Sequence, residues 1–172
     1  CACLVGSEMC IRDRYTIFKE LGFNDFTIRL NNRKLLNGLF QEIGQKDLAV
    51  EILRIIDKID KIGKDAVIEE LEKIGVDKTQ IEKIIAFIQI DGTNDDKLLK
   101  LENLNFENET FKLGLQELKE VVKNMRLFGI PENNFNVDLT IARGLDYYTG
   151  TVYETFLNDY RELRKCMLWW KI

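Results

Sequence analysis

Between Asp47 and Phe128 the sequence contains no proline, and its apolar residues recur at the three- and four-residue spacing of one helix face. This pattern predicts a run of helices packed as a small bundle, with no strand among them. The only proline, Pro131, follows Gly129, and together they end the run. The apolar stripes are Leu48, Ile52, Ile55, Ile56 and Ile59, then Val67, Ile68, Leu71 and Ile74, then Ile81, Ile84, Ile85 and Ile88, and finally Phe111, Leu115, Leu118, Val122 and Met125.

Glycines separate these helical segments, and each is followed within two or three residues by a short acidic or amide side chain. The pairs are Gly44 with Asp47, Gly63 with Asp65, Gly75 with Asp77, and Gly92 with Asn94. Glycine adopts the left-handed conformation that ends a helix without steric cost. The Asp or Asn is expected to cap the next helix by accepting hydrogen bonds from free backbone N–H groups.

Stretches typical of strands flank the helical run. Phe26–Leu30 alternates apolar and polar residues until Asn31-Asn32 breaks the pattern, and the stripe over Arg33–Ile43 predicts a helix. Phe135–Ile141 alternates again, and Tyr147–Phe156 is rich in aromatic and β-branched residues. Helices inserted between strands of an antiparallel sheet predict the α+β class. Strands with so few partners are expected to leave exposed sheet edges.

Composition excludes several kinds of site. The chain of 172 residues has no histidine, which rules out histidine bases and histidine metal ligands, and its net charge of −4 gives no reason to expect nucleic-acid binding. No apolar run could span a membrane and no secretory signal is recognisable, so a cytoplasmic location is expected. The spacing of the cysteines matches no zinc site, and no metal ligands are predicted. These cysteines are Cys1, Cys3, Cys10 and Cys166.

Side chains suited to chemistry are concentrated around Arg143, between two predicted strands. An arginine carries a fixed charge on a planar group that fits phosphate or carboxylate, and Gly144 lets a ligand approach the backbone. Asp146, Tyr147 and Tyr148 follow, and tyrosine offers a flat face and a hydroxyl to an aromatic ligand. From residue types alone, an Arg–Asp turn with tyrosines in the core is the simpler interpretation.

The order of these residues nevertheless resembles a known family. Ala142–Glu154 is similar, almost letter for letter, to the histidine-A motif of histidyl-tRNA synthetases. Phe26–Gly38 resembles the strand and helix that follow motif 2 in that family, and the helical run resembles its insertion domain. The resemblance extends over about Tyr15–Tyr160, most of the chain.

The resemblance implies a class II aminoacyl-tRNA synthetase, which activates histidine with ATP to histidyl-adenylate and transfers it to tRNA(His). It implies that Arg143 contacts the α-phosphate of ATP as a catalytic residue, and that Tyr148, with Tyr147, binds histidine. Supporting roles fall to Gly144, Asp146 and Glu154. It also implies Mg²⁺ as a cofactor, although no ligand for it is identified here, and a homodimer for the full-length enzyme.

On this interpretation the chain divides into a catalytic-core piece at 15–46, a helical insertion domain at 47–128 and catalytic-core strands at 129–160. Residues 1–14 and 161–172 differ in composition from the rest. The first segment is interpreted as not native, and the second as not native or as a truncated tail. Motifs 1, 2 and 3 and the second histidine motif have no counterpart in the sequence. The chain is therefore interpreted as an internal fragment, and the isolated chain is expected to be inactive.

Two alternatives remain. One is the regulatory, synthetase-like subunit of the ATP phosphoribosyltransferase of histidine biosynthesis, which lacks adenylation residues; the presence of Arg143 and Tyr148 speaks against it. The other is a helical binding module without enzymatic activity. The match over Ala142–Glu154 and the consistent spacing to Phe26–Gly38 speak against that second alternative.

Overall fold

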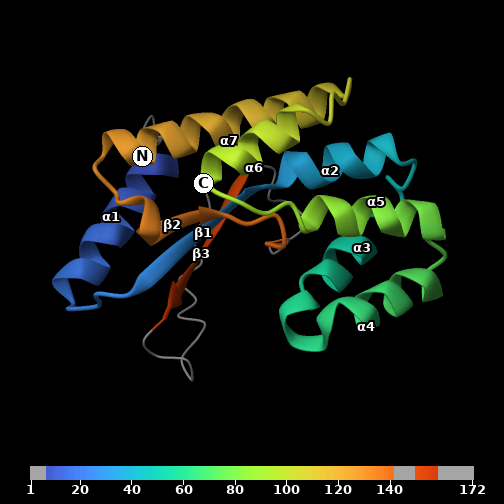
Figure 1. Ribbon diagram of the computed structural model, residues 1–172, viewed down its shortest axis with the longest axis horizontal. Coiled ribbons are helices and arrows are strands. Elements are labelled where there is room, and N and C mark those ends of the chain that lie inside the picture. Colours follow the sequence, from blue (N-terminus) through green and yellow to red (C-terminus); the bar gives the residue numbers. More distant parts are fainter. Residues whose placement is uncertain (1–6, 142–149, 159–172) are drawn as a thin grey trace.

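The computed structural model describes residues 7–141 and 150–158, with residues 7–10 described by their backbone alone. Helices surround a small sheet, and the helices α3 to α5 extend away from it to one side (Figure 1). In chain order the elements are α1 (Ser7–Glu20), β1 (Phe26–Asn32), α2 (Arg33–Glu42), α3 (Ala49–Ile56), α4 (Ile59–Lys73), α5 (Lys78–Ile88), α6 (Asn94–Glu102), α7 (Glu109–Leu127), η1 (Glu132–Asn134), β2 (Phe135–Val137) and β3 (Thr151–Leu157).

The sheet confirms the α+β class, with one difference in strand direction. β1 lies in the middle, pairs antiparallel with β3 over its whole length, and pairs parallel with β2. The parallel pair replaces the antiparallel neighbour that the sequence predicts. A parallel pair needs a long crossover connection, and the helices between Asn32 and Phe135 provide one.

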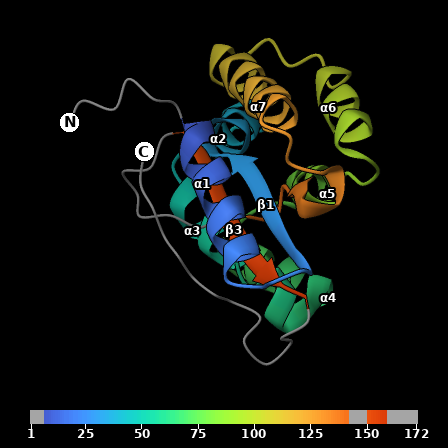
Figure 2. The ribbon, with the colours of Figure 1, turned by 90° about the vertical axis from the view of Figure 1, so that its left-hand side faces the viewer.

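One face of the sheet is covered by α1 and α7 (Figure 2). Phe26, Ile28 and Leu30 of β1 point into this side and have no exposed surface. The ring of Phe18 in α1 lies 5.3 Å from that of Phe26. Although the sequence suggests that residues 1–14 do not belong to the fold, Ile11 of α1 is completely buried in the same core.

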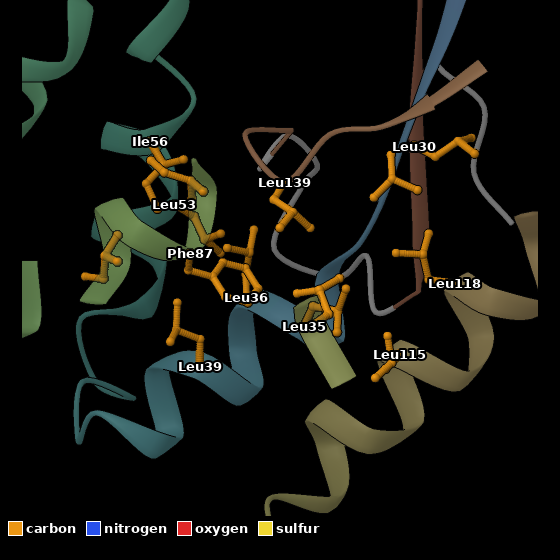
Figure 3. Close-up of a cluster of buried hydrophobic side chains, with 14 of the residues drawn as sticks. Leu30, Leu35, Leu36, Leu39, Leu53, Ile56, Phe87, Leu115, Leu118 and Leu139 are labelled. Carbon is orange, nitrogen blue, oxygen red and sulfur yellow. The ribbon is translucent and has the colours of Figure 1, made fainter. Parts of the chain in front are cut away.

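Helix α2 lies between the helices α3 and α5 on one side and helix α7 on the other (Figure 3). Leu36 and Leu39 lie toward α3 and α5, whereas Leu35 lies toward α7 (Figure 3). Helix α7 packs mainly on α2, and this close approach depends on glycine, because a Cβ at Gly38 would lie 2.6 Å from the Cβ of Phe111. Besides α2, helix α7 contacts α1, α6 and β1.

The predicted glycine positions are confirmed, whereas the predicted caps are only partly right. Gly44, Gly63, Gly75, Gly92 and Gly129 all have positive φ, and Gly63 forms a kink inside α4.

Among the predicted helix caps, Asp77 caps α5 and forms a capping box with Gln80. Two other predicted caps are wrong. Leu48 occupies the N-cap of α3 without a side-chain hydrogen bond, in place of Asp47, and Thr93 caps α6 in place of Asn94.

The strand predicted over Phe135–Ile141 is shorter in the structure and ends at Val137. The apolar residues of the alternating pattern stay buried beyond the end of the strand, since Leu139 and Ile141 are both buried. The outer edge of β2 is covered by side chains of α6, so the predicted exposed edge is wrong for this strand. Within the described ranges, no helix is long and apolar enough to cross a membrane.

Candidate functional site

Five of the six site residues predicted from the sequence lie outside the described residues. They are Arg143, Gly144, Asp146, Tyr147 and Tyr148, all between residues 142 and 149. Glu154 is described, and it lies on β3. The structure also describes the residues on both sides of this stretch, Ile141 and Gly150, and their contacts show where the stretch starts and ends.

The residues on both sides of the stretch 142–149 are held at the end of β1 where the strand passes into α2. Nδ2 of Asn31 donates a hydrogen bond to the carbonyl oxygen of Ile141 at 2.9 Å and lies 3.4 Å from that of Leu139. The backbone N–H of Arg33 donates to the carbonyl of Gly150 at 3.0 Å. Residues far apart in the sequence therefore meet at one end of the central strand.

This end of β1 is polar and buried at the same time. Asn31 and Asn32 have no exposed surface and Arg33 very little, although the sequence predicts a simple strand break there. Because buried amides are costly without hydrogen bonds, each must have specific partners. These residues are not identified as part of the site from the sequence. The signal that could have identified them is the pair of amide side chains placed directly between a strand and a helix.

Asn32 has a structural role beside Asn31. Its Oδ1 accepts the backbone N–H of Lys34 at 3.0 Å and so caps α2, while its Nδ2 donates to Glu117 of α7 at 2.8 Å. The ammonium of Lys34 pairs with the other oxygen of the same carboxylate. The start of α2 is therefore fixed to α7 by hydrogen bonds as well as by apolar packing.

Glu154 lies on the sheet face opposite the one that α1 and α7 cover. It pairs in register with Arg29 of β1, and directly opposite side chains of an antiparallel pair share a face. The guanidinium of Arg29 lies over the ring of Phe156 at 4.0 Å and pairs with Asp138 at 3.0 Å. Asp60, at the start of α4, lies 3.7 Å from Arg29, so the helical run touches this face as well.

Asp138 also organises the turn that leads toward the motif. Its Oδ1 accepts the backbone N–H of Thr140 at 3.0 Å and the hydroxyl of Thr140 at 2.6 Å, while its Oδ2 holds Arg29. These bonds fix the chain between the end of β2 and Ile141. The other side of β3 is fixed by α1, since Arg14 donates to Thr155 and lies over the ring of Tyr153 at 4.7 Å.

A separate open cavity of about 580 Å³ lies where α6 begins. Arg126 in its wall pairs with Glu132 and Asp95, and the hydrogen bond from Arg126 holds the pKa of Glu132 below its usual value. The positive charge in the wall of this cavity is therefore paired with two carboxylates of the same wall. Within residues 7–141 and 150–158 no group of three or more His, Cys, Asp or Glu residues could hold a metal ion.

Comparison with known proteins gives a consistent picture. The family model for histidyl-tRNA synthetase matches residues 14–163. The histidine–tRNA ligase of Clostridium tetani is 53% identical over 149 residues, which are 87% of this chain and 34% of that protein. The chain thus spans about a third of the length of the curated relatives that it matches.

Solved structures show the same fold. The crystal structure of histidyl-tRNA synthetase from Nostoc sp. PCC 7120 superposes with a TM-score of 0.86 at 42% identity, covering 93% of this chain and 39% of that one. A structure from Bacillus halodurans, described as an ATP phosphoribosyltransferase regulatory subunit/histidyl-tRNA synthetase, has a TM-score of 0.73 at 18% identity. It covers 88% of this chain and 39% of its own, and at that identity it indicates the fold alone.

Proposed function

The chain belongs to the histidyl-tRNA synthetase family, and on that premise we propose that it is part of the catalytic region of a histidine–tRNA ligase. The observation that carries this proposal is the motif Ala142–Glu154, together with the hydrogen bonds that hold Ile141 and Gly150, on either side of residues 142–149, at the polar end of β1. The identity of 53% to a histidine–tRNA ligase supports it further.

The proposed reaction has two steps. A carboxylate oxygen of histidine attacks the α-phosphorus of ATP, the bond to the bridging oxygen breaks, and pyrophosphate leaves. A ribose hydroxyl of the terminal adenosine of tRNA(His) then attacks the activated carbonyl, and AMP leaves. Negative charge grows on the α-phosphate and on the departing pyrophosphate during the first step, and a prepositioned cation stabilises that charge most in the transition state.

We assign the residues of the motif to these needs. Arg143 supplies the cation at the α-phosphate, because its charge is permanent and its planar group can contact two oxygens at once. Tyr148, with Tyr147, binds the histidine substrate. Gly144 allows the nucleotide close to the backbone, Asp146 orients the arginine or its turn, and Glu154 belongs to the face of the active-site sheet opposite α1 and α7.

The partners and setting are part of the same proposal. The full-length enzyme acts in the cytoplasm as a homodimer, and residues 47–128 form its helical insertion domain between core pieces at 15–46 and 129–160. Mg²⁺ would accompany ATP and screen its phosphates. The described residues offer no cluster of ligands for this ion, so no step of the mechanism is assigned to it through this chain.

The test uses a hybrid ligase, in which residues 15–160 of this chain replace the matching segment of the Clostridium tetani enzyme. Histidine-dependent exchange of pyrophosphate into ATP measures the first step alone. We expect the hybrid ligase to exchange, and Arg143→Ala to lower its rate on the order of a hundredfold to a thousandfold. Arg143→Lys should restore part of the loss, because it keeps the charge and loses the planar fork.

The same assay separates the ligase from the regulatory subunit of ATP phosphoribosyltransferase. The fold does not distinguish the ligase from the regulatory subunit, because the Bacillus halodurans structure, which is described as either, has the same fold. A regulatory subunit would show no exchange. A hybrid ligase without exchange activity, or one whose Arg143→Ala variant keeps the parent rate, would therefore refute the proposed function.

A further inference from the structure

Asn31 is a fully buried polar side chain at the end of β1, and both polar atoms of its amide have partners. It has no exposed surface. Its Nδ2 donates to the carbonyl of Ile141 at 2.9 Å and approaches that of Leu139 at 3.4 Å, and its Oδ1 accepts the backbone N–H of Asn32 at 2.8 Å. The partners of Nδ2 lie 108 and 110 residues away in the sequence.

The second flank of the motif is held two residues further along. The N–H of Arg33 donates to the carbonyl of Gly150 at 3.0 Å. Between these two donors, Asn32 is the last residue of β1 and caps α2, so the strand passes into the helix without a loop. One short and well-packed junction therefore fixes the points at which residues 142–149 begin and end.

We infer that Asn31 is a positioning residue for the adenylation step, acting through Arg143; the inference rests on the proposed function. Arg143 is two residues from Ile141, and two residues span at most about 7 Å of backbone. Asn31 therefore fixes the carbonyl from which the short connection to Arg143 starts. A misplacement of about 1 Å of a catalytic group can cost about a hundredfold in rate.

The variant that tests this most directly is Asn31→Asp in the hybrid ligase. Aspartate has nearly the same shape and keeps Oδ1 for the N–H of Asn32, but a carboxylate cannot donate to the carbonyls of Leu139 and Ile141. We expect kcat of pyrophosphate exchange to fall about tenfold to a hundredfold. The loss should appear mainly in kcat, because the charge on the α-phosphate is largest in the transition state. KM for histidine should rise by a smaller factor, because Tyr147 and Tyr148 follow in the same stretch of chain.

A matched control is available at the other end of β1. Asn134 is also buried, and its Nδ2 donates to the carbonyl of Phe26 at 2.8 Å, about 17 Å along the strand from Asn31. Asn134→Asp removes an equivalent buried hydrogen bond. It should lower the melting temperature by a similar amount and leave kcat unchanged when both variants are assayed well below their melting temperatures.

A double mutant separates positioning from a general structural effect. In the Arg143→Ala background, Asn31→Asp should lower kcat less than twofold further, because the group through which Asn31 acts is already gone. If Asn31→Asp does not fold, Asn31→Ser replaces it. Serine keeps one donor and should give an intermediate loss of kcat.

Three outcomes would overturn the inference while leaving the proposed function intact. They are an unchanged kcat in Asn31→Asp, an equal loss of kcat in Asn134→Asp, and full additivity with Arg143→Ala. A hybrid ligase that is inactive before any substitution refutes the proposed function, and the inference with it.

Discussion

The side-chain amide of Asn94 takes the place of a further strand beside Val137. Its Oδ1 accepts the N–H of Val137 at 2.8 Å, and its Nδ2 lies 3.4 Å from the carbonyl of Phe135. Lys97, one turn later in α6, donates to the carbonyl of Val137 at 2.7 Å. Unpaired N–H and C=O groups on a sheet edge invite aggregation. Helix α6 therefore protects β2 by hydrogen bonding as well as by covering it.

Asn94→Ala should destabilise the chain because it leaves the buried N–H of Val137 without its acceptor. An unsatisfied buried donor costs about 1–3 kcal/mol. Urea denaturation followed by circular dichroism measures the loss. Asn103→Ala is the control, since Asn103 is exposed at the end of the same helix. Equal denaturation midpoints for the two variants would contradict this role of Asn94.

The stability contributed by Lys97 should depend on pH. Burial disfavours its charged form and lowers its pKa below the ordinary 10.5, against the attraction of Asp138 and Asp91. Between the lowered pKa and about 10.5, the unfolded chain binds more protons than the folded one, so stability rises with pH in that window. Below the window, both states carry the proton and the cost of burying the charge is fully present.

Lys97→Met isolates this effect. The methionine variant cannot titrate, so the free energy of unfolding of the parent minus that of the variant should increase as pH rises toward about 10.5. Urea denaturation of both proteins at several pH values above neutrality measures the difference. A difference that stays flat would show that the buried amine keeps its ordinary pKa, and one that decreases with pH would show that its pKa is raised.

Gly38→Ala should force α2 and α7 apart. The new Cβ would lie 2.6 Å from the Cβ of Phe111 and 2.9 Å from its backbone nitrogen, which a rotamer change cannot relieve. Overpacking typically costs about 1–3 kcal/mol, and more when backbone must move. That exceeds the gain of about 1 kcal/mol from replacing glycine inside a helix.

Thermal denaturation of Gly38→Ala should show a lower midpoint than the parent. Gly150→Ala serves as the comparison, because a Cβ there meets nothing within 4 Å. A midpoint for Gly38→Ala at or above that of the parent would mean that the two helices separate without cost.

Features set by local periodicity could be predicted from the sequence. The apolar stripe of α7 reads directly as helix, and its residues are buried where the pattern places them. The alternation of Phe26–Leu30 likewise identifies β1. In both cases one face of the element meets the core, and the spacing of apolar residues records which face that is.

Features set by distant partners could not be predicted. Asn31 and Asn32 look like a strand break because asparagine is usually solvated, but here Leu139, Ile141 and Glu117 supply their hydrogen bonds. Similarly, α1 is missed because the composition of residues 1–14 suggests foreign sequence. The packing of Ile11 in the core and the contact of Arg14 with Thr155 show that the helix contributes to the fold.

The candidate site was likewise predictable in its local pattern and not in its distant partners. The residues around Arg143 identify the motif, because residue types and their spacing are enough to recognise its resemblance to a known family. What holds the motif in place is not readable from those residues. Its anchors, Asn31 and Arg33, lie more than 100 residues earlier in the chain and look like ordinary strand and helix ends.

Tyr148→Phe should raise the KM for histidine in the hybrid ligase and leave kcat nearly unchanged. The proposed role of its hydroxyl is one hydrogen bond to the amino acid, present in the bound substrate as well as in the transition state. Loss of such uniform binding affects KM and not kcat. A neutral hydrogen bond contributes about 1 kcal/mol, which corresponds to a rise in KM of roughly fivefold.

Tyr153→Phe is the control, because Arg14 of α1 lies over the ring of Tyr153 on the helix-covered side of the sheet. Pyrophosphate exchange measured over a range of histidine concentrations checks both variants. A KM that is unchanged in Tyr148→Phe, or that rises equally in Tyr153→Phe, would remove Tyr148 from the histidine pocket.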